Sequence, residues 1–287
     1  MAEVLVMPVA SPKLWIVVPL CEGRTEWCKA IALEAAAQGL AVAGSASDGF
    51  GASDDGADIV ICDQVTDARA SGATNERIVV LMGRPSLSDG ETRRTVSEVS
   101  SAYWEAVKFD DVRKVIPPIK GGQLVEFTPD FKVSAPALEE NDDATSKALQ
   151  QAVVILEGAD NAEWKPVLFN FDVRAMDDAK AGRPFDITGR PRFLISGPYI
   201  PMPAGSWRAK ITIGFDEGAS RSRYRVDWGG VDDYRSIEFA PSQPGYFDLI
   251  MDHEWIDASP CEMRLVLLEG LFDGMATFGG VDVVRLT

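Results

Sequence analysis

Any catalytic relay in this chain would depend on one histidine. The 287 residues contain a single histidine, His253, in the segment MDHEW. A Ser-His-Asp or Cys-His relay would have to use it. His253 alternates in phase with Phe247, Leu249 and Met251, which predicts a partly buried, hydrogen-bonded side chain near a strand end. We therefore expect no catalytic residues, and the pattern favours a non-enzyme while leaving that question open.

Other motifs that carry chemistry are missing from the sequence. It contains no HExxH, GxSxG or CxxC segment. Its 44 acidic residues make neighbouring carboxylates common, so such pairs do not indicate a glycosidase. Cys21, Cys28, Cys62 and Cys261 have unrelated spacings, which favours buried free thiols in a reducing compartment. We therefore expect a cytoplasmic protein.

Residues suited to holding a sugar occur in the C-terminal half. Sugar recognition needs aromatic planes for the apolar ring faces and planar polar groups for the hydroxyls. The segment DWGGVDDYRS (227–236) mixes these types, although a hairpin loop that covers one end of a sandwich would explain it too. The candidate ligand-binding residues are Tyr199, Arg223, Arg225, Asp227, Tyr234 and Trp255.

An anion or nucleotide site is a second candidate, near the N-terminus. Arg24 lies beside the predicted start of a helix, and Asp63 closes a predicted strand. The turn PLCEGRTE lacks both GxGxxG and GxxxxGK[ST], whose backbone amides hold phosphates. A solvated turn would explain Arg24, and a strand-end turn would explain Asp63.

The elements that would position these N-terminal residues alternate between strand and helix. Apolar runs predict strands at 14–20, 41–45, 58–63 and 77–83. Helical spacing follows in TEWCKAIALEAAAQGL and in GETRRTVSEVSSAYWEAVKF. After a tail at 1–13, we expect a small Rossmann-like parallel α/β domain over residues 14–119.

In the remaining part of the chain, residues 120–287, the spacing of apolar residues changes. QLVEFTPDFKV predicts a strand pair, and a helical excursion is expected near 143–157. Beyond residue 164 apolar and polar residues alternate, as in VLFNFDV, SWRAKITIGFD and RYRVDW. Many short, half-buried strands separated by glycine and proline turns predict an antiparallel β-sandwich.

Two segments of this second domain carry a family resemblance. FLISGPYIPMPAGSWRAKITIGFD (193–216) and ATFGGVDVVRL (276–286) resemble the carbohydrate-binding-module-like jelly roll attached to some bacterial glycosyltransferases and surface-polysaccharide proteins. The resemblance covers roughly residues 120–287. It implies a jelly-roll fold, saccharide recognition, and a structural calcium ion between the sheets near Asp282.

Charge narrows the choice of partner. The net charge of −16 repels polyphosphate backbones, so we expect no nucleic acid. The N-terminal stretch has no basic leader and is broken by prolines, so we expect no membrane span. The favoured function is non-catalytic carbohydrate binding, accessory to bacterial polysaccharide or glycan assembly. The alternatives are a reduced nucleotide-sugar-dependent glycosyltransferase, or a scaffold that binds a protein partner or itself.

Overall fold

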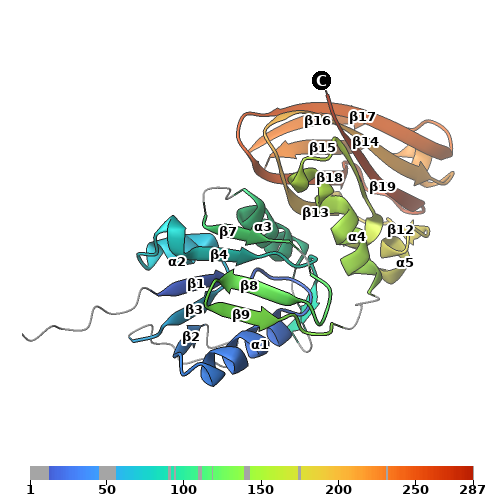
Figure 1. Cartoon of the computed structure of the whole chain (residues 1–287). Coiled ribbons are helices and arrows are strands. Elements are labelled where there is room, and N and C mark those ends of the chain that lie inside the picture. The colour runs from blue at the N-terminus through green and yellow to red at the C-terminus, as the bar shows by residue number, and fades with distance from the viewer. Residues whose placement is uncertain are drawn as a thin grey trace, which may run out of the picture. The chain divides into compact units, whose positions relative to one another are not determined.

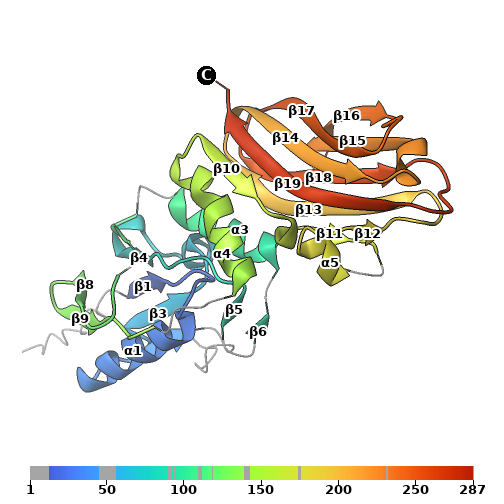
Figure 2. The same cartoon turned by 90° about the vertical axis from the view of Figure 1, so that its right-hand side faces the viewer.

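The computed structural model describes residues 13–44, 56–89, 92–93, 95–108, 112–117, 119–138, 143–173, 176–230 and 232–286. The chain divides into two compact units (Figures 1 and 2). Unit 1 comprises Met1–Arg84 and Glu105–Glu140, and unit 2 comprises Pro85–Trp104 and Asn141–Thr287. The chain therefore passes between the units three times, after residues 84, 104 and 140.

Unit 1 is built on a parallel sheet. Its strands are β1 (Leu14–Val17), β2 (Val42–Gly44), β3 (Ile59–Cys62), β4 (Ile78–Leu81) and β7 (Lys114–Ile116), in the order β2-β3-β1-β4-β7. All neighbouring pairs are parallel. β1, β3 and β4 are apolar and almost wholly buried, because both faces of a parallel sheet are covered. The parallel α/β architecture expected from the apolar runs is confirmed.

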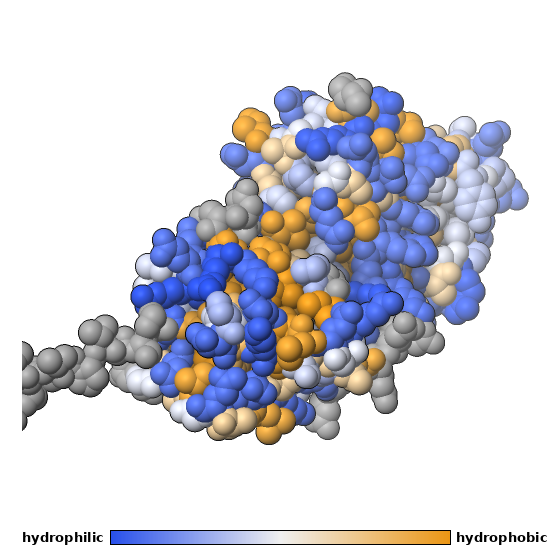
Figure 3. Space-filling view, in the orientation of Figure 1, coloured by the Kyte–Doolittle hydropathy of each residue, from blue (hydrophilic) through white to orange (hydrophobic). Residues whose placement is uncertain are grey.

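One face of this sheet is covered by a helix and a hairpin. α1 (Arg24–Ala37) turns Trp27, Ile31 and Ala35 onto the sheet at helical spacing. The hairpin of β8 (Leu124–Thr128) and β9 (Phe131–Ser134) adds Phe127 and Phe131, whose ring centroids lie 5.9 Å apart. These side chains share one core with the sheet. The space-filling view shows a band of apolar side chains beside charged ones on the visible face of unit 1 (Figure 3).

Short elements complete this part of the chain. α2 (Val65–Ala70) packs against β1, β3 and β4, and η2 (Asn75–Arg77) leads into β4. β5 (Ser88–Asp89) and β6 (Thr92–Arg93) pair, and α3 (Val96–Val107) follows. Thr95 caps α3, since Glu98 N–H donates to its Oγ1 (3.2 Å) while its own N–H donates to the Glu98 carboxylate (2.7 Å).

The division into units differs from the expected boundary after residue 119. The β8–β9 hairpin belongs to unit 1, because Phe127 and its apolar neighbours complete the core of that unit. Pro85–Trp104 belongs to unit 2, where Tyr103 Oη donates a hydrogen bond to the Glu157 carboxylate. Both departures depend on contacts between segments far apart in the sequence.

Unit 2 is a sandwich of two antiparallel sheets, which confirms the expected β-sandwich. The first sheet contains β10 (Asn161–Trp164), β19 (Met275–Arg285), β14 (Gly205–Phe215) and β17 (Gly245–Trp255), with β12 (Phe185–Asp186) against β19. The second contains β11 (Asn170–Phe171), β13 (Arg192–Met202), β18 (Ser259–Leu267), β15 (Tyr224–Gly230) and β16 (Asp233–Phe239). Aromatic contacts join the sheets, with ring centroids 5.5 Å apart for Trp164 and Trp228 and 4.4 Å apart for Phe215 and Tyr224.

The segment 193–216 forms two strands, β13 and β14, and links the two sheets. β13 lies in one sheet and β14 in the other, so the turn at Pro203 and Ala204 is a crossing between layers rather than a hairpin. Gly205 opens β14 with a φ of +131°, a backbone angle that glycine adopts readily. Trp207 Nε1 donates to the Pro203 carbonyl at 3.0 Å and holds the turn against the core.

Helical segments precede the sandwich. α4 (Ala144–Ala152) and η3 (Val153–Glu157) occupy the region where a helical excursion was expected, and Asp143 caps α4 by accepting from Ser146 N–H (2.9 Å). The strand expected at 167–173 is largely wrong, because η4 (Pro166–Leu168) begins with a proline and only β11 pairs. α5 (Met176–Lys180) and η5 (Ala219–Arg221) are single turns. No helix in the described ranges is long and apolar enough to cross a membrane.

The four cysteines are free thiols. Cys21, Cys28 and Cys261 are buried, as expected, and Cys62 is half-buried at the end of β3. Burial and the nearby carboxylates of Asp67 and Asp63 raise the pKa of Cys62 to about 12, so this thiol is a poor nucleophile.

Candidate functional site

The outward face of the β11-β13-β18-β15-β16 sheet carries a group of polar and aromatic side chains. Strand register brings them together: Gly229 pairs with Glu262 on one side and Tyr234 on the other, and Asp227 pairs with Arg264. Cross-strand partners share a face, so these side chains meet on the side turned away from the sandwich core. The Glu262 cluster consists of Phe193, Tyr199, Arg225, Asp227, Tyr234, Ser236, Glu262 and Arg264.

Glu262 is the centre of this cluster. Its side chain is only 2% exposed, and its two carboxylate oxygens accept from Tyr199 Oη (2.6 Å) and Tyr234 Oη (2.7 Å). Arg264 forms an ion pair with the same carboxylate. Burial alone would raise the pKa of Glu262, but the hydrogen bonds from Arg264, Tyr199 and Tyr234 lower it below its usual value. Glu262 therefore remains ionised.

The two tyrosines are held in their protonated form. Burial and the Glu262 carboxylate raise the pKa of both Tyr199 and Tyr234 above the ordinary value. The hydroxyl group of each tyrosine thus donates a hydrogen bond to Glu262, and its ring lies on the outward face of the sheet. This arrangement fixes both rings through their hydroxyl groups.

Arg264 joins two rings of the cluster into a platform. Its guanidinium carbon lies 4.4 Å from the centroid of Tyr234 and 5.6 Å from that of Phe193. The ion pair with Glu262 holds the Arg264 guanidinium in place beside both rings. Phe193 is half exposed, so the platform offers an apolar ring surface to solvent.

A second ion pair flanks the platform. Asp227 is buried, with 3% of its surface exposed, and accepts from Ser236 Oγ at 2.7 Å. Arg225 Nη2 donates to the other Asp227 oxygen at 3.2 Å. Arginine, carboxylate and hydroxyl groups therefore stand beside the rings on one sheet face.

Tyr199 has an unusual backbone conformation. Its φ is +64°, and the β13–β18 register shifts between Pro198 and Pro201. A left-handed conformation at a residue other than glycine costs about 1–3 kcal/mol and is often found at functional sites. The hydrogen bond from Tyr199 to Glu262 helps to maintain it.

A cavity of about 340 Å³ lies next to Tyr199 in unit 2. It is lined by Pro198 and Tyr199 of β13, by Leu168, Asn170 and Lys180, and by the start of α3. Tyr199 therefore contributes to both the cluster and this cavity.

Two of the predicted ligand-binding residues lie outside the cluster. Arg223 is exposed and forms ion pairs with Glu238 (2.9 Å) and Glu269 (3.6 Å). Trp255 is only 3% exposed and packs on Trp228 inside the sandwich, with ring centroids 5.7 Å apart. The expectation that Trp255 offers an exposed ring is therefore wrong, because the Trp255 side chain points from β17 into the sandwich.

The predicted anion site brings its two residues into direct contact. Val18 and Asp63 follow the neighbouring parallel strands β1 and β3, at their carboxyl ends. Arg24 is only 2% exposed, donates from Nε to the Val18 carbonyl (3.0 Å) and forms an ion pair with Asp63. The protein itself thus supplies partners for this guanidinium.

The predicted calcium residue lies on an outer surface. The Asp282 carboxylate is half exposed and pairs with Lys210 Nζ at 2.8 Å on the neighbouring strand β14. It does not point between the sheets, so the expected location is wrong. Within the residues that the structure describes, no group of three or more His, Cys, Asp or Glu side chains could hold a metal ion.

His253 is buried as predicted, but its hydrogen bonding differs. It is 6% exposed, its ring centroid lies 4.3 Å from that of Trp255, and its Nδ1 has no hydrogen-bond partner among the described residues. Burial lowers the pKa of His253 below its usual value. A neutral, enclosed imidazole results.

The candidate residues chosen from the sequence leave out four members of the cluster: Phe193, Ser236, Glu262 and Arg264. A signal for Glu262 and Arg264 was present, because they alternate with the apolar Cys261, Met263 and Leu265 in β18. Alternation identifies their face, but only strand order places that face beside Tyr199 and Tyr234.

Comparisons with known proteins give weak similarities. No family model matches the chain, and no curated protein matches it. Among solved structures, TmCBM61 in complex with β-1,4-galactotriose is 13% identical, with 36% of this chain and 69% of that chain covered and a TM-score of 0.28. A family 16 carbohydrate binding module is 11% identical, with 36% and 74% covered and a TM-score of 0.27. The glycosylation associate protein Gap123 complex from Streptococcus agalactiae is 10% identical, with 85% and 49% covered and a TM-score of 0.26. TM-scores this low establish neither a family nor a ligand for this chain.

Proposed function

We propose that unit 2 is a non-catalytic carbohydrate-binding domain, and that the chain is an accessory protein of bacterial polysaccharide or glycan assembly in the cytoplasm. The Phe193–Arg264–Tyr234 platform, with the Glu262 and Asp227 carboxylates beside it, carries this proposal. The resemblance of segments 193–216 and 276–286 to jelly-roll domains of glycan-related proteins supports it. In this proposal a Rossmann-like unit 1 accompanies a jelly-roll unit 2.

The chemistry of a sugar matches the cluster group by group. A pyranose ring offers C–H groups on one face, which stack on the rings of Phe193 and Tyr234. Its hydroxyl groups accept from guanidinium groups, which the partly exposed Arg225 and Arg264 supply at the edge of the platform, while the buried Asp227 holds Arg225 in place. The neighbouring cavity of about 340 Å³ would accept a ring substituent or the next sugar unit.

Binding suits this arrangement better than glycoside cleavage. A general acid for glycoside hydrolysis needs a raised pKa, so that it holds a proton at neutral pH. The pKa of Glu262 is lowered and its carboxylate already accepts from two tyrosines and an arginine. Glu262 is therefore a structural anion that orients its neighbours.

A glycan array with matched variants tests the proposal. We expect the full chain to bind at least one glycan class, and Tyr234→Ala to weaken that binding at least about tenfold, because truncating an aromatic anchor removes stacking area. Tyr234→Phe keeps the ring and should retain more binding than Tyr234→Ala. Tyr246→Ala, which removes an exposed tyrosine from the other sheet, should bind like the unchanged chain.

The proposal fails if no glycan binds, or if Tyr234→Ala and Tyr246→Ala behave alike. A thermal-shift panel separates the alternatives, since a ligand stabilises the protein that it binds. Stabilisation by uridine or guanosine diphosphates alone would support the glycosyltransferase alternative instead. Stabilisation by neither sugars nor nucleotides, with self-association in solution, would support the scaffold alternative.

A further inference from the structure

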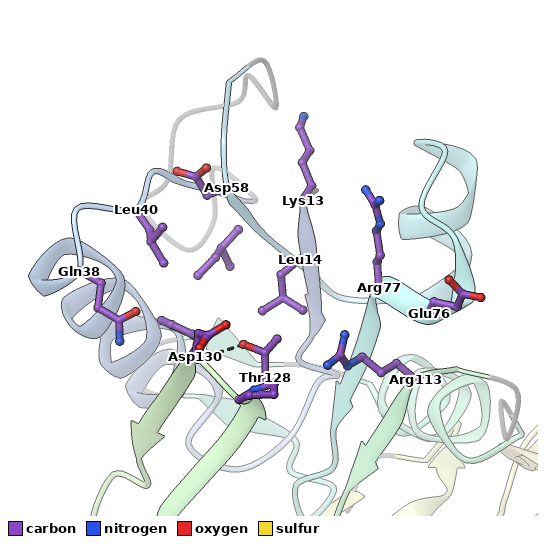
Figure 4. Close-up of a pocket in the computed structure, with 13 residues that line it drawn as sticks. Lys13, Leu14, Gln38, Leu40, Asp58, Glu76, Arg77, Arg113, Thr128 and Asp130 are labelled. Atoms are coloured by element: carbon purple, nitrogen blue, oxygen red, sulfur yellow. Dashed lines mark hydrogen bonds between the residues drawn. The ribbon is translucent and has the colours of Figure 1, made fainter. Parts of the chain in front are cut away.

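Unit 1 contains a cavity of about 550 Å³ at the amino ends of its parallel strands (Figure 4). The starts of β1, β3, β4 and β7 line it, together with the end of α1 and the turn between β8 and β9. Open α/β sheets usually bind ligands at the carboxyl ends of their strands, where Arg24 and Asp63 lie in this protein. The cavity is at the opposite edge of the sheet and belongs to no site described above.

Basic residues precede three of these strands. Lys13 precedes β1, Arg77 precedes β4 and Arg113 precedes β7. The strand order β1-β4-β7 makes the three neighbours, since parallel strands begin at the same edge. The lining also holds three acidic residues, Asp58, Glu76 and Asp130, so basic and acidic side chains are present in equal number around the cavity.

Two of these cations lack a partner within the part of the chain that the structure describes. No carboxylate there forms an ion pair with Arg77 or Arg113, and neither guanidinium donates a hydrogen bond there. Figure 4 shows the Arg113 side chain extending across the cavity toward Thr128, while Arg77 rises at the rim. A guanidinium in this state is available to a planar anion, which it binds with two parallel hydrogen bonds.

The rest of the lining is apolar below and polar on the far side. Leu14, Ile59 and Phe131 are buried beneath the cavity, and Leu40 adds to this apolar floor. The opposite wall carries Gln38, Asp58 and Asp130 (Figure 4). The cavity thus has Arg77 and Arg113 at one end, where Glu76 lies beside Arg77, an apolar middle, and acceptors at the other end.

We propose that this cavity binds a small organic anion, with its carboxylate or phosphate on Arg113 and Arg77 and its apolar body on Leu14, Leu40 and Phe131. Its volume falls in the range of small-molecule sites. The apolar floor selects an anion with a ring or chain over an inorganic ion. The acceptors on the far wall favour a ligand that also carries a hydroxyl or amino donor.

Titration calorimetry on the full chain tests the charge requirement. Phenyl phosphate and phenylacetate probe the two kinds of anion, inorganic phosphate lacks the apolar body, and phenol lacks the charge. We expect saturable binding of at least one of the first two below about 10 mM, and weaker binding of the other two probes. Arg113→Gln and Arg77→Gln should each weaken the binding at least about tenfold, since each removes a charge-assisted hydrogen bond.

Arg84→Gln is the matched control, because Arg84 is an exposed arginine of unit 1 that does not line the cavity. It should bind as the unchanged chain does. Methyl NMR then locates the probe: the Leu14 and Leu40 signals should shift, while that of Leu33, exposed on α1, should not. Binding that Arg113→Gln leaves intact, equal binding of inorganic phosphate, or no binding of either organic anion would overturn the proposal.

Discussion

Glu262 and His253 are both buried in unit 2, but their surroundings favour opposite charge states. Glu262 receives hydrogen bonds from two tyrosines and an arginine, so its charged form is stabilised in the fold. His253 packs edge-on against Trp255, and the nearest Asp233 oxygen is 3.9 Å from its Nε2. Burial therefore dominates at His253 and keeps the imidazole neutral.

The state of His253 predicts a pH dependence of stability. Its pKa is lowered in the fold by burial and returns to about 6.5 on unfolding, so the unfolded chain binds more protons below that pH. The free energy of unfolding should therefore be at its full value above about pH 6.5 and fall as the pH drops below 6.5 toward the lowered pKa of the folded state. Urea unfolding above and below pH 6.5 measures the change.

His253→Gln removes this proton uptake and should flatten the dependence in that range. Glu254→Gln, a change at an exposed neighbour on the same strand, should keep it. Equal pH dependence in the unchanged chain and in His253→Gln would contradict the assignment of a neutral buried imidazole.

The sequence predicted several residues of the Glu262 cluster but not the residue at its centre. Tyr199, Arg225, Asp227 and Tyr234 were recognised as sugar-type residues, and the structure places all four in the Glu262 cluster. Glu262 was not recognised, because its role depends on receiving donors from β13 and β16, which are distant in sequence. That the residues of the Glu262 cluster bind a ligand stays a prediction.

At the scale of elements, alternation was a good guide where strands are long and one face is buried. β14, β17 and β19 follow the predicted two-residue period along most of their length. The pattern misled at 167–173, because Pro166 removes a backbone donor and opens a 3₁₀ turn. Sheet membership was also beyond local sequence, because β13 and β14 are consecutive strands joined by a short turn and yet belong to different sheets.

A glycine in β19 provides an element-scale prediction. Gly280 has a φ of +99°, and a Cβ atom there would lie 2.5 Å from the Trp164 carbonyl oxygen of β10. Gly280→Ala should lower the free energy of unfolding by about 2–4 kcal/mol, because it adds a backbone clash to a strained dihedral angle. Denaturant unfolding of the full chain measures the loss.

Gly245→Ala measures the effect of a positive φ without a steric clash, for comparison with Gly280→Ala. Gly245 also has a positive φ, +145°, but an added Cβ would meet nothing within 4 Å. We expect a smaller loss there, about 1–2 kcal/mol. If both variants lose the same stability, the close approach of β19 to β10 does not explain why residue 280 is a glycine.

At the scale of the whole molecule, the chain does not divide at one point. Unit 2 takes Pro85–Trp104 from the first half of the chain and secures it to its helical segments. Leu87 N–H donates to Ser146 Oγ (3.1 Å), and Gln150 Nε2 donates to the Pro85 carbonyl (3.1 Å). A change of composition near residue 120 could not reveal this exchange, because it depends on contacts between distant segments.

This exchange predicts the behaviour of a truncated chain. A fragment of residues 141–287 should melt at a lower temperature than unit 2 does in the full chain, because it lacks the hydrogen bond from Tyr103 to Glu157 and the apolar contacts of Pro85–Trp104. Adding a peptide of residues 85–104 should raise the melting temperature. Thermal denaturation followed by circular dichroism measures both effects.

A scrambled peptide of the same composition is the control and should leave the melting temperature unchanged. A fragment as stable as unit 2 in the full chain, indifferent to the native peptide, would show that residues 85–104 are not an integral part of unit 2.

The three passages of the chain between units also determine the order in which the protein can fold on the ribosome. Residues 85–104 are synthesised well before Ser146, Gln150 and Glu157, the partners that hold them. Unit 1 cannot finish its core until β7 and the β8–β9 hairpin have emerged, and the sandwich cannot close until β19 leaves the exit tunnel. Pro85–Trp104 therefore lacks these partners until the chain beyond residue 157 has been synthesised, which delays completion of unit 2.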